Sequence, residues 1–213
     1  MPPKRICFDA FIKDTLMKKL LIPAILIVAL LAIFGSSYNR FMAADQNVQE
    51  QTGQLQNEVQ RQSDLIPNLV NTVKGYATHE HDTLTDYAAA RSGETPLNRI
   101  DPRTVDNATL QQKILEAQSR NAKEISAINA VVEQSPQLQA NQDFSRLMVQ
   151  LEGSQNRITV ARQRLQQAIL SYNQTVMHFP GNLVAGIMGY HARVYYQASP
   201  EAQTPPVVDF SKH

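Results

Sequence analysis

The stretch that decides the fold is residues 142–179, QDFSRLMVQLEGSQNRITVARQRLQQAILSYNQTVMHF. Apolar side chains recur in it every three or four residues, a spacing that gathers them on one face of an α-helix. The stripe consists of Phe144, Leu147, Leu151, Ser154, Ile158, Ala161, Leu165, Ala168, Tyr172, Val176 and Phe179, with Ser154 as its only polar member. Asn141 is placed to cap the helix, and Pro180-Gly181 ends it. The pattern predicts one long helix over 142–179 that buries this stripe against other helices.

Three further stretches before it have the same spacing, at 39–63, 65–92 and 105–134. Pro67 separates or kinks the first two, because its ring opposes a continuous helix. In one alternative they form a single bent helix that continues the segment before them. Residues 92–104 contain one Gly and two Pro, and they predict a loop. Short connections favour antiparallel neighbours, so we expect an all-α, up-and-down bundle of about four long helices.

The N-terminal part of the chain contains an uninterrupted apolar run, Leu20 to Phe34. Extended to Tyr38 it would form a helix of about 28 Å, just enough to cross a bilayer core. Residues 1–19 carry five Lys and Arg against two Asp, whereas Arg40 is followed by no further Lys or Arg until Arg61. The positive-inside rule then places the N-terminus in the cytoplasm and the helical domain outside it. A cleaved signal peptide is the alternative, which the lack of a clean cleavage site disfavours.

Four regions follow from these patterns. They are a basic cytoplasmic lead (1–19), a transmembrane helix (20–38), a helical bundle (39–198) and an extended C-terminal tail (199–213). The net charge of +1 argues against a protein that binds nucleic acid by neutralising phosphates. The single Cys excludes an intrachain disulfide framework and Cys-rich zinc patterns.

Several motifs in one order resemble the LemA family. They are Asp64–Val70, Thr72–Ala77, His79-Glu80, Ala140-Asn141, Leu151–Ser154, Asn156–Ile158, Val160–Arg162, Tyr172-Asn173, Phe179-Pro180 and Pro206–Phe210. The resemblance covers nearly all of residues 38–210. It implies a single-pass bacterial membrane protein with a helical bundle, located in the cytoplasmic (inner) membrane, and a family without an agreed biochemical activity.

Two groups of residues are candidate interaction sites. The first is the polar run Asn156, Arg157, Arg162 and Arg164, in which Arg157 and Arg164 lie seven residues apart and share a helix face. These arginines suit an acidic partner or a lipid headgroup, and the alternative is pairing inside the bundle with carboxylates such as Glu152.

The second group is Leu183, Ile187 and Tyr190, in a Gly-rich apolar segment. This segment predicts a short helix that caps the end of the bundle. The alternative is a patch that docks another protein or touches the membrane, because Gly permits the close approach of another backbone.

No catalytic arrangement is evident, and we predict neither an enzyme nor a cofactor. His79 and Asp82 share a helix face and are weak metal candidates, but position 83 is Thr, so the two-His metalloprotease motif fails. The leading interpretation is a non-enzymatic scaffold or adaptor at the bacterial cytoplasmic membrane. Its expected partners are the lipid bilayer and either a second copy of the chain or another membrane protein. The alternatives are a ligand-sensing bundle and a metal-assisted hydrolase that uses His79.

Overall fold

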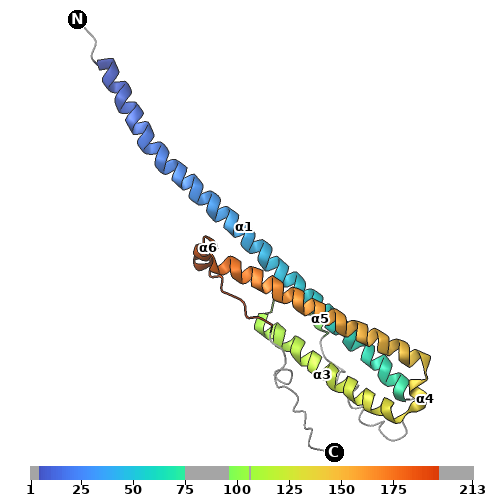
Figure 1. The fold of residues 1–213 in the computed structure, drawn as a ribbon. Helices are drawn as coiled ribbons and strands as arrows, with labels where there is room; N and C mark the ends of the chain where they lie inside the picture. Colours follow the sequence, from blue (N-terminus) through green and yellow to red (C-terminus); the bar gives the residue numbers. More distant parts are fainter. Residues whose placement is uncertain (1–4, 75–95, 106, 197–213) are drawn as a thin grey trace, which may run out of the picture. The chain divides into compact units, whose positions relative to one another are not determined.

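A computed structural model of the chain describes residues 5–74, 96–105 and 107–196. Its elements are α1 (Arg5–Lys74), the 3-10 helix η1 (Leu97–Arg99), α3 (Asn107–Gln134), α4 (Pro136–Gln139), α5 (Gln142–Met177) and α6 (Gly181–Met188) (Figure 1). Every element in these ranges is a helix, which confirms the predicted all-α class.

The chain divides into two compact units, which are described separately below. The first, here called the anchor unit, comprises Met1–Asp45 and Tyr172–Ala192. The second, the bundle unit, comprises Gln46–Ser171 and Arg193–His213. The predicted tail 199–213 lies outside the described residues.

Helix α1 is continuous over 70 residues, so the predicted separation of 39–63 from 65–92 is wrong as far as Lys74. The alternative of one helix that continues the apolar segment is correct over that range. The reason is that Ile66, Leu69 and Val73 are buried and extend the apolar stripe past Pro67, which itself is exposed. Burying each of the three is worth about 1.5–3 kcal/mol, which together outweighs the roughly 3 kcal/mol cost of a Pro inside a helix. Residues 75–92 of that prediction lie outside the described residues.

Contacts between α1 and α3 show that the two helices run parallel in the bundle unit. The Gln56 side chain donates to the carbonyl of Leu97, shortly before α3, at 2.9 Å, and Ser63 donates to Asn121 within α3 at 3.0 Å. Residues further along α1 therefore contact residues further along the segment that leads into and forms α3, so the two helices point in the same direction. Helix α5 runs antiparallel to both, as predicted for neighbours, because its first turn packs near the end of α1 (Figure 1).

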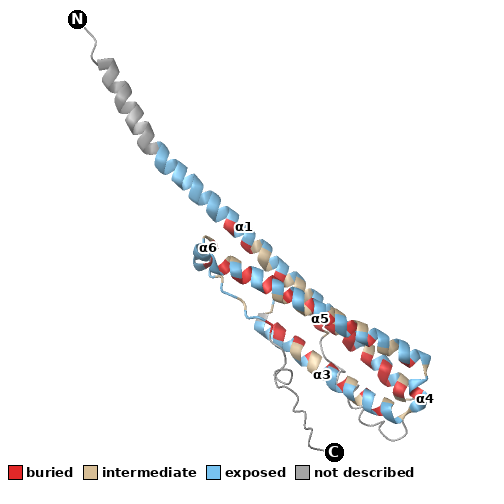
Figure 2. Cartoon of the chain, in the orientation of Figure 1, coloured by how far each residue is buried: buried red, intermediate tan, exposed pale blue. Residues whose placement is uncertain are grey.

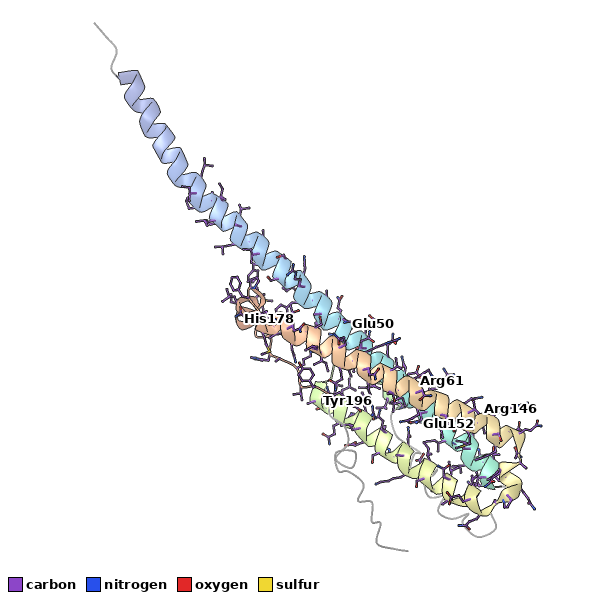
Figure 3. The ribbon with its side chains drawn as sticks, viewed as in Figure 1. Glu50, Arg61, Arg146, Glu152, His178 and Tyr196 are labelled. Carbon is purple, nitrogen blue, oxygen red and sulfur yellow. The ribbon has the colours of Figure 1, made fainter. Side chains whose placement is uncertain are left out.

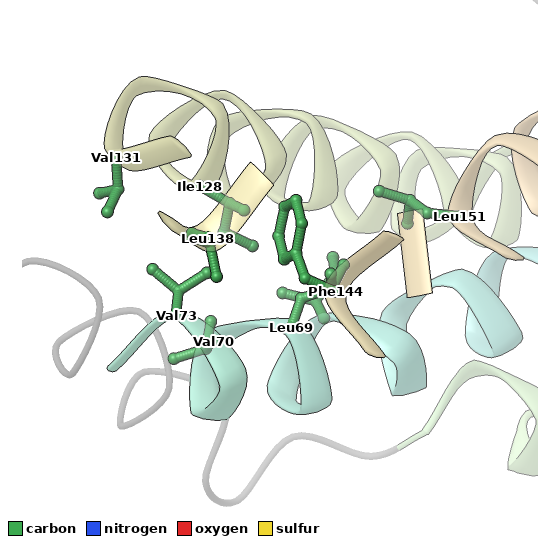
Figure 4. Close-up of a cluster of buried hydrophobic side chains, with 9 residues drawn as sticks. Leu69, Val70, Val73, Ile128, Val131, Leu138, Phe144 and Leu151 are labelled. Atoms are coloured by element: carbon green, nitrogen blue, oxygen red, sulfur yellow. The ribbon is translucent and has the colours of Figure 1, made fainter. Parts of the chain in front are cut away.

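A cluster of buried apolar side chains packs together in the bundle unit near the C-terminal end of α1 (Figure 4). It consists of Ile66, Leu69, Val70, Val73, Ile128, Val131, Leu138, Phe144 and Leu151. The members come from α1, α3, α4 and α5, so this one cluster joins four helices. The short helix α4 was not predicted from periodicity, because its four residues span only one turn, of which Leu138 alone is buried.

The predicted stripe on α5 is confirmed over most of its length (Figure 2). Its members from Leu151 to Val176 are all buried, including Ser154. Asn141 caps the helix as predicted, since its side-chain oxygen accepts from the amides of Asp143 at 2.8 Å and Phe144 at 3.0 Å. Phe179 was expected in the stripe and is instead exposed, because the helix ends at Met177.

Polar side chains of the bundle unit form a chain of hydrogen bonds that links three helices. Gln62 on α1 donates to Gln155 on α5 at 2.7 Å and accepts from Asn121 on α3 at 3.1 Å. Asn121 in turn accepts from Ser63 at 3.0 Å. Buried amides satisfied in this way fix the register of neighbouring helices, because a slip would leave them unpaired.

The anchor unit combines an exposed apolar helix with a small packed end. Residues 21–36 of α1 are all exposed, and burial begins at Ser37 and Phe41 (Figure 2). Phe41 contacts Tyr172 of α5 edge to face, with ring centroids 6.1 Å apart. It also stacks on Tyr190, which directly follows the left-handed Gly189 that terminates α6. The predicted short apolar helix is thus confirmed as α6.

Candidate functional site

An open groove of about 360 Å³ lies between α1 and α5 in the bundle unit. Its lining residues are Gln54, Glu58, Asn156, Arg157, Val160, Ala161 and Arg164. Helix α5 presents Arg157, Val160 and Arg164 on one face because they follow each other at spacings of three and four residues. The groove therefore combines an exposed apolar floor at Val160 with two guanidinium groups and one carboxylate.

Arg157 pairs with Glu58 across the two helices, with its Nε 2.9 Å from the Glu58 Oε2. The alternative of pairing inside the bundle is thus correct for Arg157, but the partner is Glu58 and not the suggested Glu152, which is exposed. Both side chains of the pair keep contact with solvent, so the pair stabilises the fold by no more than about 1 kcal/mol. It holds the Arg157 side chain at the groove.

Arg164 is exposed beside this pair and makes no hydrogen bond or ion pair with any residue that the structure describes. Asn156 is exposed at the same groove. The predicted shared face of Arg157 and Arg164 is confirmed, because both line this groove. Arg164 is therefore the guanidinium that remains available to a carboxylate or phosphate from outside.

Arg162 faces a different part of the bundle unit. It donates to Gln118 on α3, and its guanidinium carbon lies 5.4 Å from the centre of the Tyr196 ring. The Tyr196 hydroxyl donates to the same Gln118 oxygen at 2.9 Å, and its carbonyl accepts from Gln166. Arg162 thus holds Tyr196, which is labelled in Figure 3, on the bundle, and Arg162 does not line the groove.

Tyr196 is buried by this arrangement. Burial raises the pKa of its phenol above the ordinary value, and the nearby Arg162 charge offsets part of that effect. Its neighbour Tyr195 is exposed.

The second candidate group lies on and after α6. Leu183 and Ile187 are exposed, whereas Tyr190 packs on Phe41. The inner face of the helix, Val184 and Ala185, is buried. The three residues therefore divide into an exposed apolar pair and a packing residue.

The His79–Asp82 cluster lies outside the described residues, so the weak metal prediction stays a prediction. In the part of the chain that the structure describes, no group of three or more His, Cys, Asp and Glu side chains is placed to hold a metal ion.

The fold defines a class of protein, a bundle of long helices whose first helix contains an apolar segment near its N-terminal end. Of the helices described, α1 over Leu21–Lys74 is long and apolar enough to cross a membrane, judged by length and composition. This N-terminal helix is a candidate membrane anchor.

The chain belongs to the LemA family, whose family model matches residues 51–210. This match confirms the resemblance found in the motifs. The chain is also similar to magnetosome proteins MamQ 1 and MamQ 2 of Paramagnetospirillum magneticum, each 24% identical over 203 residues, with 87% of this chain and 74% of the relative covered. Magnetosome protein MamQ of Magnetospirillum gryphiswaldense is 21% identical over 201 residues, with the same coverage.

Proposed function

We propose that the chain is a membrane-anchored, non-enzymatic scaffold or adaptor. In this proposal α1 spans the bacterial cytoplasmic membrane once, with the N-terminus in the cytoplasm and the helical domain outside it. The charge asymmetry around the apolar segment supports this orientation. Protease added to spheroplasts tests this orientation. We expect the helical domain to be cleaved and the N-terminus to stay protected.

One observation carries the proposal: α1 supplies both the apolar candidate span and one wall of the groove. Residues 21–36 of this helix are exposed and apolar, whereas Glu58, further along it, holds Arg157 at the groove. A protein bound in the groove would be joined to the membrane through a single helix. Tethering of this kind raises the effective concentration of a partner at the membrane.

The chemistry of the groove indicates the kind of partner. Arg164 is an exposed donor for a carboxylate, Val160 offers apolar contact, and the polar rim includes Asn156 and Gln54. Arg, an apolar floor and a polar rim are the usual composition of a protein-binding surface. We propose a second copy of this chain or another membrane protein that presents an acidic segment, and no nucleic acid.

Affinity purification from membranes through a C-terminal tag tests this function. We compare the wild-type chain with Arg164→Glu, which reverses the groove charge, and with Arg146→Glu as the matched control. Arg146 is also an exposed α5 arginine, but it pairs with Asp143 at 3.8 Å outside the groove. We expect one partner to be recovered with the wild type and the control and to be lost with Arg164→Glu. Recovery of the same proteins with all three contradicts the assignment of the groove.

The same groove supports a second candidate, the binding of a small anionic ligand by a sensing domain. Arg157 and Arg164 line a volume of about 360 Å³, enough for a small carboxylate or phosphate ester. A thermal-shift screen of the full chain in detergent with such anions tests it. A stabilising anion whose effect is lost in Arg164→Gln favours sensing, and the absence of any shift favours the scaffold.

A further inference from the structure

The outer face of α6 is apolar and uncovered. Leu183 is 59% exposed and Ile187 is 73% exposed, and they lie four residues apart on one face. Phe179, just before the helix, is 77% exposed. Residues 177–190 contain no Asp, Glu, Lys or Arg. Exposed apolar side chains gathered on one helix face are typical of a surface that contacts another molecule or a membrane.

The structure holds α6 close to the end of the apolar part of α1. Tyr190 stacks on Phe41 at a centroid distance of 5.0 Å, and a Cβ added at Gly181 would lie 3.8 Å from the Phe41 ring. Phe41 follows Tyr38, the end of the predicted span, by three residues, which is about 4.5 Å along a helix axis. The exposed face of α6 is therefore fixed within the same unit as the apolar helix surface of residues 21–36.

We infer that α6 is an interfacial helix, with Leu183, Ile187 and Phe179 inserted into the headgroup–acyl boundary of the membrane that α1 crosses. The inference rests on the anchor in the proposed function. A helix of this kind lies in the plane of the interface with its apolar face buried about 5–10 Å. Phe41, on which α6 is held, lies only about 4.5 Å beyond the end of the span, so the α6 face is within reach of that boundary. Tyr38 ends the span and Arg40 follows it shortly before Phe41; both are exposed, and aromatic and cationic side chains at these positions favour the headgroup region.

Lipid is favoured over a second protein because the α6 face is held beside the end of the apolar part of α1 within one unit. The bilayer that surrounds residues 21–36 therefore lies next to α6, and covering the α6 face requires no further partner. The contacts that fix α6 also leave its polar Asn182 exposed beside Leu183, as expected for a helix lying between lipid and water.

The test uses the full chain in vesicles of phosphatidylethanolamine with phosphatidylglycerol as the minor lipid. Cys7, the single cysteine, is first replaced by Ser. An environment-sensitive fluorophore is then attached in separate variants: Leu183→Cys and Ile187→Cys on α6, Ile27→Cys in the span, and Val149→Cys on α5. Val149 is the matched control because it is 67% exposed, close to the value for Ile187. Each variant is quenched with doxyl-labelled lipid and, separately, with aqueous iodide.

We expect doxyl lipid to remove most of the emission at positions 183 and 187 and iodide to have little effect there, with the reverse at 149. Doxyl quenching at 27 together with iodide quenching at 183 and 187 overturns the inference while the anchor stands. Protection from both quenchers at 183 and 187 also overturns it, because a protein surface then covers α6. Loss of doxyl quenching at 27 as well would instead reject the anchor in the proposed function.

Discussion

The ring of Tyr190 stacks on the ring of Phe41, with centroids 5.0 Å apart and planes inclined by 21°. The two residues are 149 positions apart in the sequence, and the contact is what joins the end of α6 to α1. Tyr172 of α5 meets the same Phe41 ring at 87°, so three helices of the anchor unit converge on one side chain. Aromatic pairs in these geometries contribute about 0.5–1.5 kcal/mol beyond the area that they bury.

Tyr190→Ala should release α6 from the anchor unit. The stacking on Phe41 and the apolar contact are both lost, which we expect to cost about 1–2 kcal/mol of local stability. Hydrogen exchange of the amides in α6 measures the effect directly and should accelerate by roughly 5- to 30-fold. Tyr195→Ala is the control, because Tyr195 is exposed and lies in the other unit. Equal exchange in both variants contradicts the role of the stacking.

Two glycines of α6, Gly181 at its first position and Gly186 inside it, should respond in opposite directions to replacement by Ala. A Cβ at Gly181 would overlap the carbonyl oxygen of Thr175, so Gly181→Ala must move backbone and should destabilise the unit by about 1–3 kcal/mol. A Cβ at Gly186 meets nothing within 4 Å. Gly186→Ala should stabilise the helix by up to about 1 kcal/mol, since Ala is the better helix former. Thermal unfolding of the full chain in detergent compares them, and equal shifts would be incompatible with this packing.

Two buried serines provide a further matched pair. The Ser154 hydroxyl has no hydrogen-bond partner among the residues that the structure describes, whereas Ser63 donates to Asn121. Removing an unsatisfied hydroxyl relieves a desolvation cost, so Ser154→Ala should raise the free energy of unfolding by about 1 kcal/mol. Ser63→Ala leaves Asn121 with one acceptor site unfilled and should lower it by about 1–2 kcal/mol. Urea unfolding in detergent measures both, and a loss of stability in Ser154→Ala would show that its hydroxyl is satisfied.

Tyr196 should make the stability of the bundle unit fall at high pH. Burial raises the pKa of its phenol in the folded state above the ordinary 10.0, so the unfolded chain loses this proton first as pH rises. The contribution of the Tyr196 phenol to the free energy of unfolding is therefore fully present below pH 10.0. It is lost as the pH rises through the folded-state pKa of this phenol. Unfolding measured across this range should show a smaller decline for Tyr196→Phe than for wild type. Identical pH profiles would mean that Tyr196 titrates as an exposed tyrosine.

The spacing of apolar residues predicted the long helices, because a helix that is buried on one face needs an apolar residue at every third or fourth position. In α5 every third or fourth residue from Leu151 to Val176 faces the core, and the capping chemistry of Asn141 marks where the helix begins. The same reasoning failed at Pro67, where a local rule against Pro met a stripe that continues through Ile66 and Leu69. The deciding fact is that Pro67 lies on the exposed face, which depends on tertiary packing.

The groove was only half predictable. The spacing of the residues predicted that Arg157 and Arg164 share a helix face. The same spacing also indicates that Arg162 lies on a different face. Five residues separate Arg162 from Arg157, which turns it by roughly 140° around a helix. The pairing of Arg157 with Glu58 joins residues 99 positions apart, and no spacing rule within one helix reaches that far.

The most direct test of the proposed scaffold is site-specific photocrosslinking in intact membranes. A photoreactive amino acid replaces Val160, which lines the groove, in one variant and Val149, an exposed α5 residue outside the groove, in the other, and the adducts are identified by mass spectrometry. We predict that position 160 forms a discrete adduct with a second copy of the chain or another membrane protein, and that position 149 does not. Recovery of uncrosslinked monomer alone from position 160 would contradict the account.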